Sequence, residues 1–292
     1  MINPDIHSKL KEIEDCLSLL ENEYSRLKNM IMKDSDTEPI PKEEPIIKSS
    51  TKALLIGINY EETEYELRGC INDVISVEKR LKNLNCFQQF TILTDKTKIK
   101  PTRDNILKAL KILCSNAKSG ETLFFHYSGH GTYTYDRNGD EKDKKDECIV
   151  SIDGKAIVDD EIYDILKTLP KNCNFIMIFD CCHSGTIADL KFSYLRNNNR
   201  VPRINNTKDD IKANVISISG CRDNQTSADA YIQQKFQGAM TFAFLYYFKN
   251  KNISIHFLVN NMRKILREKR FPQYPILSCS KKISLTQKFI WN

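Results

Sequence analysis

Two short segments of the chain hold the residue types that nucleophilic catalysis requires. Residues 126–131 read HYSGHG, and residues 180–185 read DCCHSG. A cysteine attacks a carbonyl carbon as its thiolate, and it needs a neighbouring base that takes its proton and later protonates the leaving amine. One histidine from the first segment and one cysteine from the second would meet this need. The two segments together predict cleavage of peptide bonds by a cysteine–histidine dyad.

The cysteine doublet offers two candidate nucleophiles, and the strand pattern before it distinguishes them. Residues 174–179 form an apolar run that predicts a buried strand leading into the doublet. Side chains alternate between the two faces of a strand, so Asp180 and Cys182 project to one side and Cys181 to the other. We therefore expect Cys182 to be the nucleophile and Cys181 to pack inward.

Three histidines lie in the two segments, and their positions favour His130 as the base. His126 lies inside an apolar strand pattern, where a histidine is usually a core residue with satisfied hydrogen bonds. His183 follows Cys182 directly and is expected to point away from it. His130 lies between glycines that let a substrate backbone approach, although a turn histidine is the alternative reading. The backbone N–H groups of Gly131 and Cys182 would then form an oxyanion hole.

Strands that alternate with helices over residues 52–292 must position these segments. This alternation predicts right-handed βαβ units and a mostly parallel sheet, with helices on both faces. Sites in such sheets form beyond the carboxyl ends of the strands. We expect an α/β fold, a three-layer αβα sandwich around a six-stranded sheet. The clearest strand patterns are 53–58, 122–127, 174–179 and 215–218, and the clearest helical ones are 102–113, 239–248 and 256–267.

The two segments resemble the catalytic blocks of type I metacaspases, which are cysteine peptidases of the caspase-like fold. Three further stretches agree with the family in the same order. They are LRGCIND (67–73), DECIVSID (146–153) with IVDDEI (157–162), and ISGCRDNQTSADA (218–230) with QGAMTFAF (237–244). The resemblance begins at residue 52 and reaches nearly to the end of the chain. It implies a caspase-like fold with Cys182 as nucleophile and His130 as base.

Acidic residues near the predicted nucleophile indicate a class of substrate. A buried or partly buried pair of carboxylates can accept a guanidinium or an ammonium group. The resemblance implies that Asp73 and Asp180 line the S1 pocket, with Cys70 and Ser128 on its walls. Cleavage after Arg or Lys is therefore expected. The alternative is that Asp73 only caps a helix and that Asp180 is a turn residue.

The resemblance also implies activation by calcium, because metacaspases are typically calcium-activated. The family's metal site maps onto four positions of this chain, and all four hold aspartate. They are Asp146, Asp159, Asp160 and Asp189. Hard carboxylate oxygens of this kind suit Ca²⁺. The acidic stretch 136–147 lacks the glycine and flanking helices of an EF-hand loop, so it is not expected to be one.

Residues 190–212 form a long polar connection after the predicted nucleophile. Connections of this length beside an active site are usually lids or disordered segments. This one presents several basic residues to a peptidase that cleaves after Arg or Lys. They are Lys191, Arg196, Arg200, Arg203 and Lys208. We therefore expect a flexible processing loop, with autocleavage there or in the linker over residues 33–51.

The first 32 residues predict a separate helix. Apolar residues from Ile6 to Ile31 recur at alternating spacings of four and three, which is a heptad stripe typical of coiled coils. Such a narrow stripe favours another helix as partner, through self-association or adaptor binding. Docking on the chain's own domain is the alternative. Residues 33–51 follow as a polar linker with three prolines.

Composition argues against several other classes of protein. No apolar run approaches the roughly 18 residues of a membrane span. The N-terminus has no signal-peptide pattern, so a cytoplasmic protein without a membrane partner is expected. The net charge is +6, but the lysines are scattered and no aromatic stacking motif accompanies them, so no nucleic-acid partner is expected. The ten cysteines form neither a disulfide framework nor a CxxC zinc pair.

A scaffold protein is the main alternative to an enzyme. Such a protein would keep the caspase-like domain, turn over little substrate and act through its N-terminal coiled coil. The intact pair of Cys182 and His130 argues against this reading.

Overall fold

The computed structural model describes most of the chain after residue 50. The described residues are 51–135, 145–182, 187–195, 202–205, 208, 210–220, 229–232, 235–284 and 286–290. The heptad helix predicted over residues 6–31 and the linker predicted over 33–51 lie outside this part of the chain, apart from residue 51. So do His183 and residues 136–144 of the acidic stretch.

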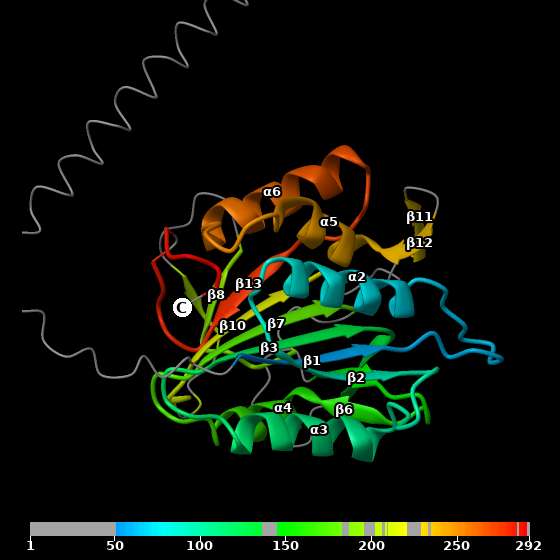
Figure 1. Ribbon diagram of the computed structural model, residues 1–292, viewed down its shortest axis with the longest axis horizontal. Helices are drawn as coiled ribbons and strands as arrows, with labels where there is room; N and C mark the ends of the chain where they lie inside the picture. Colours follow the sequence, from blue (N-terminus) through cyan, green and yellow to red (C-terminus); the bar gives the residue numbers. More distant parts are fainter. Residues whose placement is uncertain are drawn as a thin grey trace, which may run out of the picture. The chain divides into compact units, whose positions relative to one another are not determined.

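Within the described part of the chain, a central eight-stranded sheet forms the middle of the fold (Figure 1), in the order β2-β1-β3-β7-β10-β13-β8-β9. The first five strands in this order are parallel. Each of the last three runs antiparallel to the strand before it. The bounds are β1 Thr51–Gly57, β2 Gln89–Thr94, β3 Thr122–Ser128, β7 Asn174–Asp180, β8 Phe192–Tyr194, β9 Arg203–Ile204, β10 Asn214–Ser219 and β13 Ile276–Cys279.

The predicted count of six strands is wrong for this sheet. The strands from β2 to β13 make up the expected mostly parallel sheet. The two additional strands, β8 and β9, are short and come from the polar connection 190–212, whose sequence shows no strand pattern. They extend the sheet because the outer edge of β13 offers unpaired backbone groups.

Two smaller sheets lie outside the central one. The stretch DECIVSID (146–153) overlaps β5, which lies in a three-stranded sheet of β4-β5-β6. The other small sheet pairs β11 with β12, and β12 leads directly into a helix. The bounds are β4 Gly131–Tyr135, β5 Lys145–Val150, β6 Ala156–Val158, β11 Asp229–Ile232 and β12 Lys235–Gly238.

Helices cover both faces of the central sheet (Figure 1). On one face lie α2 Cys70–Asn83, α5 Ala239–Tyr247 and α6 Ile255–Glu268, and on the other lie α3 Arg103–Ser115 and α4 Asp159–Leu166. Thr102 caps α3, the helix predicted over residues 102–113, by accepting a hydrogen bond from the Asn105 N–H at 3.4 Å. No helix in the described part of the chain is long and apolar enough to cross a membrane.

The hydrophobic core has two halves, one on each side of the sheet. Alternation along β1 shows the division, since Leu55 packs in the half that includes α2, α5 and α6. Its neighbours Leu54 and Ile56 pack in the half that includes α3 and α4. Strands buried on both faces explain the continuous apolar runs of the sequence. This mixed α/β architecture is compatible with the expected caspase-like fold.

Candidate active site

The ends of β3 and β7 bring the two sequence segments together. These strands are adjacent and parallel, and Ser128 pairs in register with Asp180. His130 and Cys182 each lie two residues beyond that pair. A Cβ atom built on Gly131 would clash with the backbone carbonyl of Cys182, so the two segments are in direct backbone contact. Two loop tips that lie about 50 residues apart in sequence therefore meet at one edge of the sheet.

The two cysteines of the doublet have different surroundings. Cys181 is 3% exposed and belongs to the core on the α3 and α4 side of the sheet. Cys182 is 8% exposed and belongs to neither core cluster. This placement follows the side-chain alternation expected at the end of β7. Both cysteines are thus buried, and Cys182 is the more exposed of the two.

Two buried tyrosines hold the backbone of His130. The His130 N–H donates to the Tyr60 hydroxyl at 2.9 Å, and the Tyr127 hydroxyl donates to the His130 carbonyl at 2.7 Å. The Tyr60 hydroxyl itself donates to the Val150 carbonyl at 2.7 Å. Burial raises the pKa of both tyrosines far above the usual value, so both hydroxyls remain protonated donors. Residues from three separate elements therefore fix this histidine.

The imidazole of His130 has a defined partner on one nitrogen. Its Nε2 lies 2.7 Å from the backbone carbonyl of Tyr65, and its ring lies 4.6 Å from the Tyr60 ring, centroid to centroid. A carbonyl oxygen only accepts hydrogen bonds, so Nε2 must carry the proton of this bond. In the neutral imidazole Nδ1 is then the unprotonated nitrogen that can accept a proton.

The backbone N–H of Gly131 is directed away from β5. Gly131 faces Ile149 in the antiparallel β4-β5 pair, while the Val150 N–H donates to the His130 carbonyl at 3.0 Å. This pattern makes Gly131 and Ile149 a pair without mutual hydrogen bonds, so the Gly131 N–H points outward from the ladder. An N–H group at this position, beside Cys182, suits the predicted role as an oxyanion donor.

The residues predicted for the S1 pocket gather beside the same strand ends. Cys70 and Asp73 lie in the first turn of α2, Ser128 ends β3, and Asp180 ends β7. The Ser128 hydroxyl donates to Asp73 Oδ2 at 2.7 Å. Each of these two aspartates is 1% exposed. The structure thus brings Asp73, Ser128 and Asp180 together, and Cys70 lies in the same helical turn as Asp73.

The start of α5 contacts both carboxylates. The Gly238 N–H donates to Asp73 at 3.0–3.1 Å, and the Thr241 N–H donates to Asp180 Oδ2 at 2.7 Å. A Cβ atom on Gly238 would clash with both carboxylates, so only glycine fits there. The N-terminal N–H groups of a helix carry partial positive charge and stabilise negative groups. These donors compensate part of the charge of a buried acidic pair.

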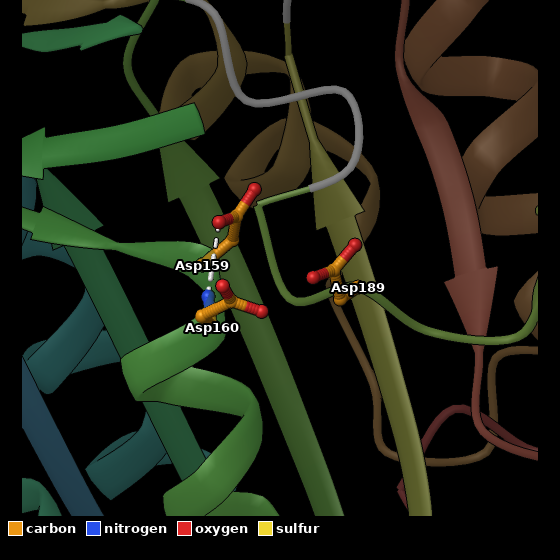
Figure 2. Close-up of side chains that lie close together, drawn as sticks. All are labelled: Asp159, Asp160 and Asp189. Carbon is orange, nitrogen blue, oxygen red and sulfur yellow. Dashed lines mark hydrogen bonds between the residues drawn. The ribbon is translucent and has the colours of Figure 1, made fainter. Parts of the chain in front are cut away.

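Three of the four predicted calcium ligands lie together (Figure 2). These three residues form an acidic cluster, in which oxygens of Asp159, Asp160 and Asp189 lie within 4.8 Å of one another. The first two begin α4, and Asp189 lies in the segment after β7. Burial and the neighbouring Asp189 raise the pKa of Asp159 to about 9. Asp146 is buried on β5 but is not part of this group.

Several residues of the site were not found from the sequence. Tyr60, Tyr127, Gly238 and Thr241 reach the predicted residues only through the tertiary fold. The one local signal in the sequence was Gly238 in QGAMTFAF, because a glycine directly before an apolar helix can mark a close backbone approach. Lys208 was recognised only as a possible cleavage site, yet it contacts the acidic cluster.

Known proteins resemble this chain over most of its length. A family model described as metacaspase, peptidase C14 domain, matches residues 51–191. Metacaspase-1 of Schizosaccharomyces pombe is 38% identical over 285 residues, which cover 78% of this chain and 67% of the relative. Metacaspase-3 of Trypanosoma brucei brucei is 38% identical over 269 residues, which cover 84% of this chain and 75% of the relative.

A solved crystal structure resembles this chain in its fold. A protein from Geobacter sulfurreducens superposes with a TM-score of 0.61 and 24% sequence identity, covering 82% of this chain and 98% of that one. A helix-covered sheet whose adjacent strand ends present a histidine segment and a cysteine segment defines the class of caspase-like cysteine peptidases, which are hydrolases acting on proteins. Within that class the similarities of sequence are decisive. The chain belongs to the metacaspase family.

Proposed function

We propose that this metacaspase is a calcium-dependent endopeptidase that cleaves after Arg or Lys, with Cys182 as nucleophile and His130 as general base and acid. One observation carries the proposal. The paired ends of β3 and β7 put the segments of His130 and Cys182 in contact, directly beside two buried carboxylates.

In the proposed mechanism, His130 takes the thiol proton on Nδ1, since Nε2 is engaged with the Tyr65 carbonyl. The Cys182 thiolate attacks the scissile carbonyl carbon, and the N–H groups of Gly131 and Cys182 donate to the oxyanion that forms. The imidazolium then protonates the leaving amine, which departs and leaves a thioester on Cys182. Water, activated by the same imidazole, hydrolyses the thioester and regenerates the thiol.

Charge supports the proposed specificity. Asp73 and Asp180 are neighbouring buried carboxylates, and the helix N–H donors compensate only part of their charge. A buried acidic pair is stabilised by a cation with several N–H donors, such as the guanidinium of Arg or the ammonium of Lys. An aspartate side chain would instead be repelled at this position.

The acidic cluster supports the calcium part of the proposal. Asp159, Asp160 and Asp189 supply hard carboxylate oxygens within 4.8 Å of one another, so a single Ca²⁺ could bind all three. A bound Ca²⁺ would compensate their charge and connect the start of α4 to the segment that follows the nucleophile. The Glu147 N–H donates to Asp159 at 2.9 Å, so β5, which carries Asp146, adjoins the same place.

The same specificity makes the chain a candidate for its own substrate. The connection 190–212 and the predicted linker 33–51 both contain Lys or Arg close to polar, proline-containing or Asn-rich sequence. Autocleavage in one of them is part of the proposal. New termini after Arg or Lys in calcium-treated protein, found by mass spectrometry, would support it.

A peptidase assay with matched peptides tests the proposal. Peptides that differ only in Arg, Lys or Asp at P1 are assayed with calcium and with a chelator. We expect cleavage of the Arg and Lys peptides only with calcium, none of the Asp peptide, and none by Cys182→Ala. Activity retained by Cys182→Ala would refute the dyad, and cleavage of only the Asp peptide would refute the pocket. No activity at all, with the fold intact, would favour a scaffold.

A further inference from the structure

Lys208 reaches into the acidic cluster from the connection between β9 and β10. Its Nζ donates to Asp160 Oδ1 at 2.7 Å and to Asp189 Oδ2 at 2.5 Å. Its ammonium also lies 5.2 Å from the centre of the Tyr163 ring on α4. Two carboxylates and an aromatic face are the surroundings that stabilise a partly desolvated cation.

This ion pair differs from its neighbour on the same connection. Lys191 pairs with Asp210 at 2.6 Å, and these side chains are 33% and 72% exposed. Lys208 is 16% exposed, and its partner Asp189 is 3% exposed. Exposed pairs such as the first contribute little because water screens them, whereas a buried carboxylate depends on its partner. The Lys208 pair is therefore an interaction on which the cluster depends.

The ammonium uses oxygens that a metal ion would also need. Ca²⁺ binds carboxylate oxygens at about 2.3–2.6 Å. An ammonium held at hydrogen-bond distance from Asp160 and Asp189 would lie within a few ångströms of such an ion, and the two positive charges would repel strongly where little water screens them. The cluster can satisfy one of these cations at a time.

We propose that Lys208 is the chain's own counter-cation for this cluster and that Ca²⁺ binds by displacing it. The inference rests on the proposed function, because it concerns the same calcium site. Lys208 lowers the apparent calcium affinity, since binding must first break its two ion pairs. It thereby sets the calcium concentration that the enzyme requires. Displacement also releases Lys208 from Asp160 and Tyr163 on α4.

Calcium titration of a catalytically inactive protein tests this inference. Isothermal titration calorimetry with CaCl₂ is performed on full-length Cys182→Ala, which cannot cleave itself, and on the same protein with Lys208→Gln, Lys208→Arg or Lys191→Gln. We expect Lys208→Gln to bind calcium more tightly by a factor on the order of ten. Lys208→Arg keeps the charge and should bind like the parent. Lys191→Gln removes a lysine from the same connection without touching the cluster and should also bind like the parent.

Thermal unfolding gives a second readout that does not depend on activity. Without calcium, Lys208→Gln should unfold at a lower temperature than the parent, because Asp189 loses its buried partner. With saturating calcium the difference should disappear.

The outcomes separate the inference from the proposed function. If the parent binds calcium and Lys208→Gln binds it equally well, the inference is overturned while the calcium site stands. An equal gain from Lys191→Gln would assign the effect to net charge and overturn it too. If no protein in the set binds calcium, both the inference and the calcium-dependent function are overturned.

Discussion

His130 depends on hydroxyl groups that take no part in the proposed chemistry. Its backbone N–H and carbonyl are both engaged by tyrosines, Tyr60 and Tyr127, whose rings are buried. Gly129 is confined by the same two hydroxyls, since a Cβ there would lie 2.6 Å from one and 3.0 Å from the other. The position of the base is thus set by the packing around it.

Replacing Tyr60 with Phe should therefore lower turnover without altering specificity. The change leaves the part-buried His130 N–H without its acceptor, so we expect the loop to shift to satisfy it. We expect kcat on an Arg peptide to fall about 10- to 100-fold, with little change in KM, because small displacements of a catalytic group are costly. Steady-state kinetics measures both values.

A matched variant shows whether the effect belongs to the Tyr60 hydroxyl or to the loss of any tyrosine hydroxyl near His130. Tyr65 contacts the imidazole through its backbone carbonyl, and its side chain is 64% exposed. Tyr65→Phe should leave kcat unchanged. Equal kcat values for Tyr60→Phe and the parent would contradict the positioning role.

At the residue scale, the different surroundings of the two cysteines in the doublet could be predicted from local geometry. Alternation along one strand was enough to separate Cys181 from Cys182, because the direction of a side chain is fixed by its position in the strand. The tyrosine contacts of His130 could not be predicted in this way. They join the segment after β1, β3 and the end of β5 across the fold, and hydroxyl contacts of this kind carry no sequence periodicity.

At the scale of elements, β3 is buried on both faces, and His126 lies in its middle. His126 is 0% exposed, and its Nε2 lies 3.0 Å from the hydroxyl of Thr241 in α5, the residue whose N–H donates to Asp180. Its Nδ1 has no hydrogen-bond partner among the described residues. Burial lowers the pKa of His126 to about 3, so the imidazole stays neutral in the folded protein.

Acid should consequently destabilise the fold through this strand. Between its ordinary value of about 6.5 and about 3, the unfolded chain binds a proton at His126 that the folded chain does not. The free energy of unfolding therefore falls as pH decreases through this window, by up to about 1.4 kcal/mol per pH unit from this group. Substituting His126 with Gln removes that contribution.

Urea unfolding at about pH 7, about pH 5.5 and about pH 4.5 compares the variants in the Cys182→Ala background. We expect His126→Gln to lose less stability on acidification than its parent. His256→Gln, on the partly exposed α6, controls for the loss of a histidine. Parallel loss of stability in the parent and in His126→Gln would contradict the assignment.

Prediction at the scale of elements was reliable for long, strongly patterned segments. The strands at 122–127 and 174–179 and the helix capped by Thr102 are present close to their predicted bounds. The strands β8 and β9 escaped prediction because they contain three and two residues and are held by pairing with β13 rather than by their own sequence.

At the scale of the whole molecule, the central sheet is mixed rather than parallel throughout. Its parallel part carries the site at its carboxyl edge, as βαβ topology requires. Its antiparallel part, β13-β8-β9, combines two short strands from within the connection 190–212 with β13, which lies more than 60 residues further along the chain. The order of strands along the chain and the order across the sheet therefore differ, and the sequence pattern does not reveal this difference.

The arrangement of the sheet predicts the fate of a molecule cut between β8 and β9. On a denaturing gel, calcium-treated protein cleaved there should give two bands, while Cys182→Ala gives one. In gel filtration without denaturant the cut protein should still elute as one peak at the position of the intact chain. Separate elution of the two pieces would contradict this expectation.

The reason lies in how the two pieces alternate across the sheet. The first piece would contain β7 and β8, and the second would contain β9, β10 and β13. In the sheet, β10 pairs with β7, and β8 pairs with both β13 and β9. The two fragments would therefore remain paired with each other at several separate strand–strand contacts. Cleavage at this point would break one peptide bond without separating the fragments. The processed enzyme would need no reassembly, and its activity would not fall on dilution.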